Sequence, residues 1–306
     1  ATLTAANTAA DATAAVVVVT PGTTYTLTTG TDFVSGTALD DIINAVRGGS
    51  SSTTETYSPT DQINGGGGTD TLYIESDRTA ENLATVTNME KMQVTNAGAA
   101  ASVLTVTLPN DKAYTNLENL NSTGEVTFSA ISNADMNGGI TSQPNGEVTT
   151  FGYTSTALLG ATDNLDVELV GVDGDLKLTG GTAANAMETI TLNSLSDGEI
   201  DTLTTTNMNT TKLVFTGSGA LNVRNITDTG ATINVYDASA STGNITVTGD
   251  NATSNTITGG AGNDTLGGAA GSDVITGGTG NDQITGGAGN DNLDGCLLYT
   301  SPSPRD

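Results

Sequence analysis

"GGAGNDTLGGAAGSDVITGGTGNDQITGGAGNDNLDG", residues 259–295, repeats a pattern of glycines, one aspartate and one aliphatic residue with a period of nine. The tract comprises GGAGNDTLG (259–267), GAAGSDVIT (268–276), GGTGNDQIT (277–285) and GGAGNDNLD (286–294), after a degenerate DNATSNTIT (250–258). In each unit six turn residues precede three strand residues, because glycine permits tight turns and one aliphatic side chain can be buried per strand. The period therefore predicts a stack of short strands joined by turns.

Two such units would form one flattened coil with a turn at each edge. Leu266 would then lie under Ile284 in one sheet, and Ile275 under Leu293 in the other. Stacked coils lie about 4.8 Å apart, so aspartates on the same edge would repel by roughly 3 kcal/mol per pair at an effective dielectric constant of 20. Calcium would relieve this repulsion, because it accepts about six to eight oxygen ligands and mixes carboxylates with main-chain carbonyls.

Composition narrows the classes of function. The 306 residues carry 34 Asp and Glu against 8 Lys and Arg, a formal charge of -26, which disfavours nucleic acid and anionic membrane surfaces as partners. The chain has no His and one Cys, Cys296, which excludes internal disulfides, Cys/His metal sites and His-dependent nucleophiles. The apolar run at 14–20 is too short to cross a bilayer, so we expect a soluble protein without membrane insertion.

The rest of the chain predicts an all-β fold. Short Thr- and Val-rich segments with apolar residues on alternate positions recur at 104–108, 125–128, 165–170, 175–179, 189–193, 212–216, 233–237 and 245–249. Gly, Asn, Asp and Ser fill the gaps between these segments, as turns require. The spacing favours a parallel β-solenoid, and an antiparallel β-sandwich remains the alternative for the middle region, residues 75–250.

The repeated pattern G-G-x-G-x-D-x-apolar-x resembles the calcium-binding nonapeptide of the repeat-in-toxin (RTX) family, also called the hemolysin-type calcium-binding repeat. The resemblance implies a right-handed parallel β-roll in which each Ca²⁺ lies between turns two repeats apart. Asp264 and Asp282 would share one ion, and Asp273 and Asp291 another on the opposite edge. The implied carbonyl ligands are Gly259, Ala261, Asn263, Gly268, Ala270, Ser272, Gly277, Thr279, Asn281, Gly286, Ala288 and Asn290.

Two residues depart from the pattern. Ala269 replaces the second glycine of its repeat, and we expect strain in that turn because alanine disfavours the conformations open to glycine. Asn255 replaces the aspartate of the degenerate unit, and we expect weaker ion binding there.

Weaker metal candidates lie upstream. "GGGGTDTLY" (65–73) fits the nonapeptide once with Asp70 in the ligand position, and "LTTGTDFVSGTALDDIIN" (27–44) contains two partial copies with Asp32 and Asp41. An isolated copy lacks the neighbouring turn, so each alone predicts a β-turn rather than a calcium site. A looser recurrence places Glu90, Glu118 and Glu188 ahead of strand-like segments, where we interpret them as solvated edge charges with a buried Met or Leu beside them.

These features divide the chain into an N-terminal Thr/Gly-rich region with degenerate repeats (1–74), a Thr-rich β-solenoid body (75–249) and the calcium-binding β-roll (250–295). The remainder, "CLLYTSPSPRD" at 296–306, resembles a translated transposon sequencing adapter and is excluded from the prediction. On that reading the natural protein continues past Gly295. The chain begins at Ala1 with no visible secretory leader, although a cleaved leader would leave such a start.

At the level of the whole chain, the composition is similar to bacterial RTX-type surface-layer (S-layer) proteins and large secreted adhesins. That similarity implies type I secretion, an extracellular or cell-surface location, and self-association in a surface lattice, with Ca²⁺ as the cofactor. The alternatives are a calcium-dependent adhesin module that binds a cell-surface glycan, or the non-catalytic part of a larger secreted glycan hydrolase or lyase. We expect no catalytic residues, because Asp166, Glu168, Asp173, Asp175 and Lys177 are best explained as a solvated face.

Overall fold

A computed structural model of the chain describes residues 22–46, 56–82, 85–108, 114–133, 136–154, 156–158, 163–181, 187–230, 233–249 and 254–295. Regular structure within these residues is entirely β, and none of them forms a helix that could cross a membrane. The predicted adapter segment and the apolar run at 14–20 lie outside the described residues.

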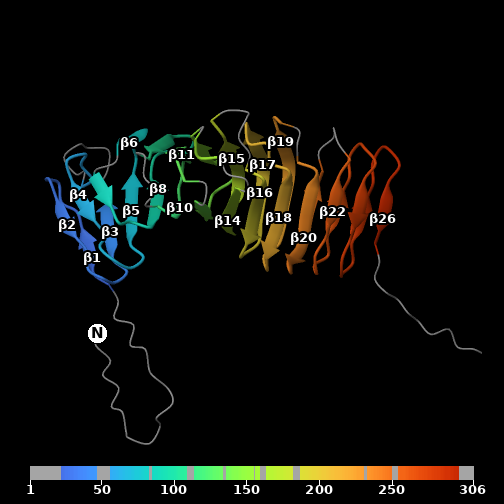
Figure 1. Ribbon diagram of the computed structural model, residues 1–306, viewed down its shortest axis with the longest axis horizontal. Helices are drawn as coiled ribbons and strands as arrows, with labels where there is room; N and C mark the ends of the chain where they lie inside the picture. Colours follow the sequence, from blue (N-terminus) through green and yellow to red (C-terminus); the bar gives the residue numbers. More distant parts are fainter. Residues whose placement is uncertain are drawn as a thin grey trace, which may run out of the picture.

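The strands form three parallel sheets that wind into one elongated solenoid (Figure 1). One face is a 13-stranded sheet in the order β1 (Thr24–Thr26), β3 (Ile42–Val46), β5 (Thr71–Ser76), β8 (Lys91–Asn96), β10 (Asn116–Leu120), β12 (Asn137–Thr141), β14 (Asn164–Val170), β16 (Thr189–Ser194), β18 (Lys212–Gly217), β20 (Val235–Ser241), β22 (Thr256–Thr258), β24 (Val274–Thr276) and β26 (Asn292–Asp294). The chain crosses to the other side of the coil between successive members of this sheet.

The second side holds a 10-stranded and a 3-stranded sheet. The larger has the order β25 (Gln283–Thr285), β23 (Thr265–Gly267), β21 (Ile245–Thr248), β19 (Leu221–Asp228), β17 (Gly198–Thr206), β15 (Asp173–Thr179), β13 (Val148–Tyr153), β11 (Glu125–Ile131), β9 (Val103–Thr107) and β6 (Ala80–Asn82). The smaller contains β2 (Phe33–Ser35), β4 (Gln62–Asn64) and β7 (Thr85–Thr87). Between β5 and β8 the chain adds one strand to each of these sheets, so the second side changes sheets there.

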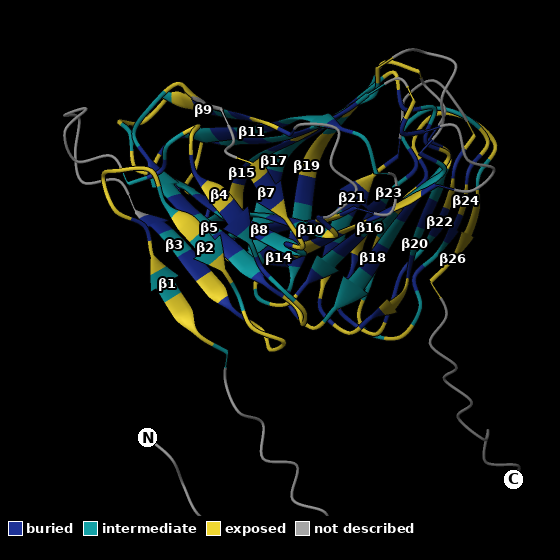
Figure 2. Ribbon diagram, turned by 60° about the vertical axis from the view of Figure 1, so that its left-hand side comes forward, coloured by how far each residue is buried: buried dark blue, intermediate teal, exposed yellow. Residues whose placement is uncertain are grey.

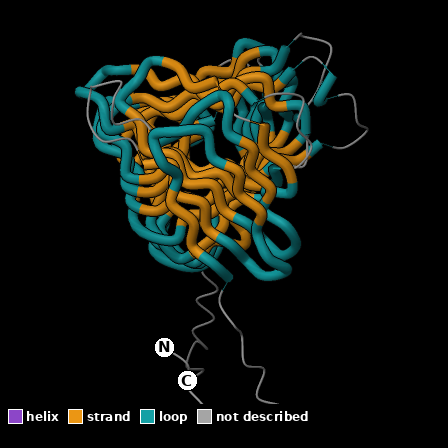
Figure 3. Tube along the Cα trace, turned by 90° about the vertical axis from the view of Figure 1, so that its left-hand side faces the viewer, coloured by secondary structure: helices purple, strands orange, loops and turns teal. Residues whose placement is uncertain are grey.

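The strand directions decide between the two folds predicted for the middle region. Every strand pair described between residues 75 and 250 is parallel, so the antiparallel sandwich is wrong and the solenoid is confirmed. Viewed along the long axis, successive coils lie behind one another (Figure 3). An alternating apolar pattern is common to both folds, and only the connections between strands separate them.

The core is a stack of inward side chains, and buried positions alternate with more exposed ones along most of the longer strands (Figure 2). On the long sheet Ile43 pairs with Leu72 and Leu72 with Met92, and all three are buried. At Gly138 the row lacks a side chain, and a β-carbon there would meet the ring of Phe151 from the opposite sheet. Phe151 in turn stacks on Phe128 with ring centroids 5.4 Å apart, so aromatic volume fills this gap.

The nonapeptide register is confirmed. Leu266 pairs with Ile284 in one sheet, and Ile275 pairs with Leu293 in the other. Leu266 and Ile275 are fully buried, whereas Leu293 is 47% exposed on β26, the last strand that the structure describes in its sheet. The four units therefore form coils of two units each, with turns at opposite edges.

Ala269 adopts the left-handed conformation expected of a glycine, with φ of 71°. The corresponding Gly278 and Gly287 have φ of 93° and 104°. An L-residue in this region costs about 1–2 kcal/mol, so the predicted strain at Ala269 has a structural basis.

Candidate calcium-binding turns

The first nonapeptide turn folds around the carboxylate of Asp264. The Oδ2 atom of Asp264 accepts the backbone N–H of Gly260 at 2.8 Å, and its Oδ1 atom accepts the N–H of Ile245 from the previous coil at 2.8 Å. Asp264 is 1% exposed. Glycine at the start of the turn lets the chain curl tightly enough for a carboxylate to reach back four residues.

Aspartates two repeats apart are joined by direct hydrogen bonds. The N–H of Asp264 donates to Oδ1 of Asp282 at 3.0 Å, and the N–H of Asp273 donates to Oδ1 of Asp291 at 3.0 Å. The structure thus brings together the predicted pairs on two separate edges. Part of the expected repulsion is offset, because one oxygen of each later carboxylate accepts a backbone N–H.

Other oxygen atoms in these turns have no such partner. Oδ2 of Asp273 and Oδ2 of Asp282 are buried and accept no hydrogen bond from the described residues. A β-carbon on Gly268 would meet both Oδ2 of Asp273 and the carbonyl oxygen of Gly286, so oxygens from two turns face one small space. An uncompensated buried carboxylate oxygen is costly, and a cluster of carboxylate and carbonyl oxygens suits a hard cation. The residues present therefore fit calcium.

The first glycines of the other edge repeat this arrangement. A β-carbon on Gly259 would meet the carbonyl oxygen of Gly277 and Oδ2 of Asp264. The other carbonyl candidates on this edge are Ala261, Asn263, Thr279 and Asn281, and those on the opposite edge are Ala270, Ser272, Ala288 and Asn290. The carbonyl of Ala288 already accepts the N–H of Gly271 at 2.9 Å.

A second ladder of side chains runs beside the aspartates. Asn244 Oδ1 accepts the N–H of Asn263 at 2.7 Å, and Asn263 Oδ1 accepts the N–H of Asn281 at 2.8 Å. These bonds run from the later coil to the earlier one, opposite in direction to the aspartate bonds. The two ladders together fix the spacing of the turns on this edge, and the role of the asparagine that precedes Asp264 and Asp282 was not predicted from the sequence.

Asn255 lies at the aspartate position of the degenerate unit and is 1% exposed. Its backbone N–H donates to Oδ1 of Asp273 at 2.7 Å, and its Nδ2 donates to the carbonyl oxygen of Gly268 at 3.0 Å. The side-chain nitrogen of Asn255 thus lies against the carbonyl and carboxylate oxygens that a cation would coordinate. This geometry supports the expectation of weaker ion binding at Asn255.

The upstream candidates are not isolated turns. The N–H of Asp41 donates to Oδ1 of Asp70 at 2.7 Å, and the N–H of Gly67 donates to the carbonyl of Thr37 at 2.9 Å, so turns 29 residues apart in sequence lie together. The premise that these copies lack a neighbouring turn was therefore wrong. Backbone hydrogen bonding from Thr37 lowers the pKa of Asp41, whereas burial raises the pKa of Asp70.

Asp32 belongs to the other edge and does not join Asp41 and Asp70. Its N–H donates to Oδ1 of Asp61 at 2.9 Å. Asp61 was missed in the sequence, although "TDQI" at 60–63 matches the "NDQI" of the third nonapeptide at 281–284 apart from its first residue. Without the glycines that precede it elsewhere, this unit did not fit the repeat pattern.

The three glutamates interpreted as solvated edge charges are half-buried and hydrogen-bonded, so that interpretation was wrong. Glu90 Oε2 accepts the N–H of Asp70 at 2.8 Å, and Glu188 Oε2 accepts the N–H of Asp163 at 2.6 Å. Glu118 forms an ion pair with Lys91 at 2.7 Å. The inward Met and Leu expected beside them, Met89, Met187 and Leu117, are fully buried.

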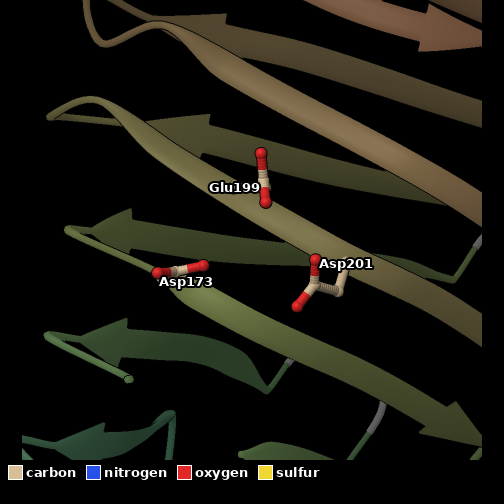
Figure 4. A group of neighbouring side chains, drawn as sticks. All are labelled: Asp173, Glu199 and Asp201. Atoms are coloured by element: carbon tan, nitrogen blue, oxygen red, sulfur yellow. The ribbon is translucent and has the colours of Figure 1, made fainter. Parts of the chain in front are cut away.

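The residues considered for catalysis do not converge. Asp166 and Glu168 are exposed on β14 in the long sheet, whereas Asp173, Asp175 and Lys177 lie on β15 in the 10-stranded sheet. Asp173 lies beside Glu199 and Asp201 instead, with one oxygen of each within 4.8 Å of the others (Figure 4). Burial raises the pKa of Asp201, and the nearby Arg224 opposes that shift.

Arg224 lies beside this acidic group and provides it with a positive charge from within the chain. Its guanidinium lies 2.5 Å from Glu199 and 3.6 Å from Asp201. Two of the three carboxylates therefore have a counter-charge within the chain, as in an ordinary surface ion-pair network.

The family comparison agrees with the geometry of the turns. A model of the RTX calcium-binding nonapeptide repeat, built of four copies, matches residues 60–76, 250–275 and 267–295. The matched segments contain the upstream turn at Asp70 and all four nonapeptide units of the roll. No match was found among curated proteins.

Proposed function

Because this chain carries RTX calcium-binding nonapeptide repeats, we propose that it is a secreted, calcium-stabilised structural protein and a fragment of a self-assembling bacterial surface-layer subunit. In this role the solenoid is a rod, and calcium binding in the turns holds its C-terminal end folded. The domain division given by the sequence is part of the proposal, with residues 250–295 as the calcium-dependent element.

The observation that carries calcium binding is the pair of unpartnered carboxylate oxygens, Oδ2 of Asp273 and Oδ2 of Asp282. Each lies in a glycine turn stacked on another turn with an aspartate at the same position. When bound, calcium supplies the positive charge that these oxygens lack, and Asp264, Asp273, Asp282 and Asp291 with the neighbouring carbonyls would hold it. Since the assembled site exists only in the folded roll, ion binding stabilises that state by mass action.

Self-association is supported by the ends of the stack. Strands β1 and β26 end the long sheet and β25 ends the second, so each pairs with a described strand on one side only. Phe33 on β2 is 74% exposed, and Leu293 on β26 is 47% exposed. Free strand edges and exposed apolar side chains favour contact between copies, while the net charge of -26 opposes it until cations are present.

We propose no catalytic activity for this part of the protein. In the acidic group beside Asp173, the carboxylates of Glu199 and Asp201 share Arg224 as a counter-charge, and in the calcium turns Asp282 and Asp291 each accept a backbone N–H. A location outside the cell suits the weak sites typical of extracellular modules, since calcium there is in the millimolar range, about 10⁻³ M.

The test is a calcium titration of the chain from chelator into millimolar calcium, followed by circular dichroism and light scattering on the same samples. We expect a gain of β signal together with large ordered particles. The same gain with a monomer throughout would reject the surface layer in favour of a glycan-binding adhesin or the stalk of a larger enzyme. No spectral response would reject calcium-coupled folding.

A further inference from the structure

The upstream nonapeptide turn at 65–70 is followed in the stack by a turn of different sequence, "TNMEK" at 87–91, which the RTX match does not cover. Asp70 donates its N–H to Oε2 of Glu90 at 2.8 Å, and its carbonyl accepts the N–H groups of Glu90 and Lys91. Asp282 accepts the N–H of Asp264 in the same way. Glu90 therefore takes the position that an aspartate holds in the roll.

The surroundings of Gly65, the first glycine of this upstream turn, also match those of the first glycine in a nonapeptide of the roll. A β-carbon on Gly65 would meet Oδ2 of Asp70 and the carbonyl oxygen of Asn88. In the roll, a β-carbon on Gly259 would meet Oδ2 of Asp264 and the carbonyl of Gly277. Asn88, with φ of 50°, thus provides the carbonyl that the next nonapeptide provides elsewhere, and asparagine tolerates this left-handed conformation.

Among the described residues, no basic group acts on the carboxylate of Asp70. Its side chain is fully buried, and its Oδ2 atom accepts no hydrogen bond from the described residues. The charged groups of the described residues that act on its carboxylate, Glu90, Asp41 and Asp40, are all acidic. A buried carboxylate among other carboxylates is stabilised either by a proton or by a bound cation.

We propose that Asp70, Glu90 and the main-chain carbonyl of Asn88 hold one divalent cation, with calcium as the ion that fits. All the donors are oxygens, which suits a hard cation, and carboxylates combined with a carbonyl suit the irregular coordination of calcium. The site is built from one repeat turn and one ordinary solenoid turn, so calcium binding extends beyond the nonapeptides. It deepens the calcium binding proposed above, yet lies near β5 and β8, far from β22 to β26 at the other end (Figure 1).

The experiment uses the full chain, with calcium binding measured by calorimetry and amide hydrogen exchange followed by mass spectrometry, with and without calcium. The variant is E90Q, whose side-chain oxygen can still accept the N–H of Asp70, so the fold is retained. E188Q is the matched control, because Glu188 makes the same bond to Asp163 outside the RTX matches. D70N is a second variant that removes the unpartnered oxygen directly.

In the wild type, calcium should slow exchange in β5 as well as in β22 to β26. E90Q and D70N should lose the calcium effect at β5 and bind one calcium at least tenfold more weakly, while the roll and E188Q respond as the wild type does. Unchanged calcium binding and unchanged protection of β5 in both E90Q and D70N would overturn the proposal. So would a wild-type chain whose roll responds to calcium and whose β5 does not. A response at β5 without one in the roll would support this site and reject the proposed role of the roll.

Discussion

The Nδ2 atom of Asn255 donates a hydrogen bond to the carbonyl oxygen of Gly268 at 3.0 Å and lies 3.3 Å from Oδ1 of Asp273. In the proposed calcium turns, a cation would draw together a carbonyl and a carboxylate oxygen of this kind. The asparagine supplies an N–H in its place. We therefore expect Asn255 to end the row of proposed calcium sites on the edge that carries Asp273 and Asp291.

Replacing Asn255 with aspartate should extend that row. We expect N255D to bind one more calcium than the wild type and to lose about 1–3 kcal/mol of unfolding free energy in chelator, since the carboxylate cannot donate to Gly268. Calorimetry and thermal unfolding measure both effects. N164D is the control, because it makes the same substitution at an exposed position of β14, outside the proposed calcium turns. An unchanged stoichiometry would show that Asn255 does not limit the number of sites.

Ala269 offers a test of backbone strain. With φ of 71°, A269G should raise the free energy of unfolding by about 0.5–1 kcal/mol, since relief of the left-handed strain exceeds the entropy gained by the unfolded chain. Chemical denaturation in millimolar calcium measures the change. A261G makes the same substitution where φ is not positive, and it should be destabilising. Equal effects of the two variants would contradict the explanation.

Calcium removal should act through the unpartnered oxygens. We expect the unfolding temperature of the chain to rise with calcium concentration, and D282N to reduce that rise because its Oδ2 is replaced by an amide nitrogen. At a calcium concentration about 100 times the dissociation constant the wild type gains about 2.7 kcal/mol per site. D166N removes an equal charge from an exposed strand position and should leave the rise intact. Sodium at equal ionic strength should not substitute for calcium.

The Lys91–Glu118 pair predicts a pH dependence. Burial of Glu118 tends to raise its pKa, but hydrogen bonds from Gln93, Lys91 and Thr141 outweigh burial and hold the pKa below its usual value. A lowered folded pKa means that stability is gained above the unfolded value, about 4.5, and lost as the pH falls through the folded value.

E118Q should therefore destabilise the chain at neutral pH by about 1 kcal/mol, a figure kept small because Lys91 is partly exposed to water. The difference from the wild type should shrink as the pH falls below the unfolded value. Urea denaturation at several pH values measures it, with E168Q on the exposed face of β14 as the control. A difference that grows toward acid pH would contradict the assigned direction.

The aromatic stack predicts where the solenoid body derives its stability. F151A should reduce the free energy of unfolding by about 3–5 kcal/mol, because it leaves a cavity between Phe128 and Gly138. F33A, at a side chain 74% exposed, should change stability little. Denaturation in chelator isolates the body from the calcium effect. A loss at Phe151 no greater than at Phe33 would show that the core relaxes around the cavity.

Prediction from sequence succeeded where the period is strict. The pairing of Leu266 with Ile284 and of Ile275 with Leu293 follows from the nine-residue repeat, because a fixed period leaves one register that stacks the aliphatic residues on one another. The middle region left two folds open, since alternating side chains occur in parallel and antiparallel sheets alike. Only the direction of each crossing settles that choice.

The upstream turns show the limit of reading a motif locally. The neighbours Asp41 and Asp70 are 29 residues apart, and the intervening sequence gives no period from which their stacking could be counted. The hydrogen bonds to Glu90 and Glu188 were missed for a related reason. A single glutamate before a strand does not indicate which residue of the preceding coil lies next to it.

A coil of the roll uses 18 residues, the separation of Asp264 from Asp282, and each nonapeptide is half of it. Adding two units would move the residues after the roll by one strand spacing, about 4.8 Å, along the rod and leave them on the same side of it. Adding a single unit would instead present them on the opposite side of the rod. The number of repeats thus sets both the length of the rod and the side of it on which the following residues begin. A tract that lengthens by two units at a time changes the length and keeps the side.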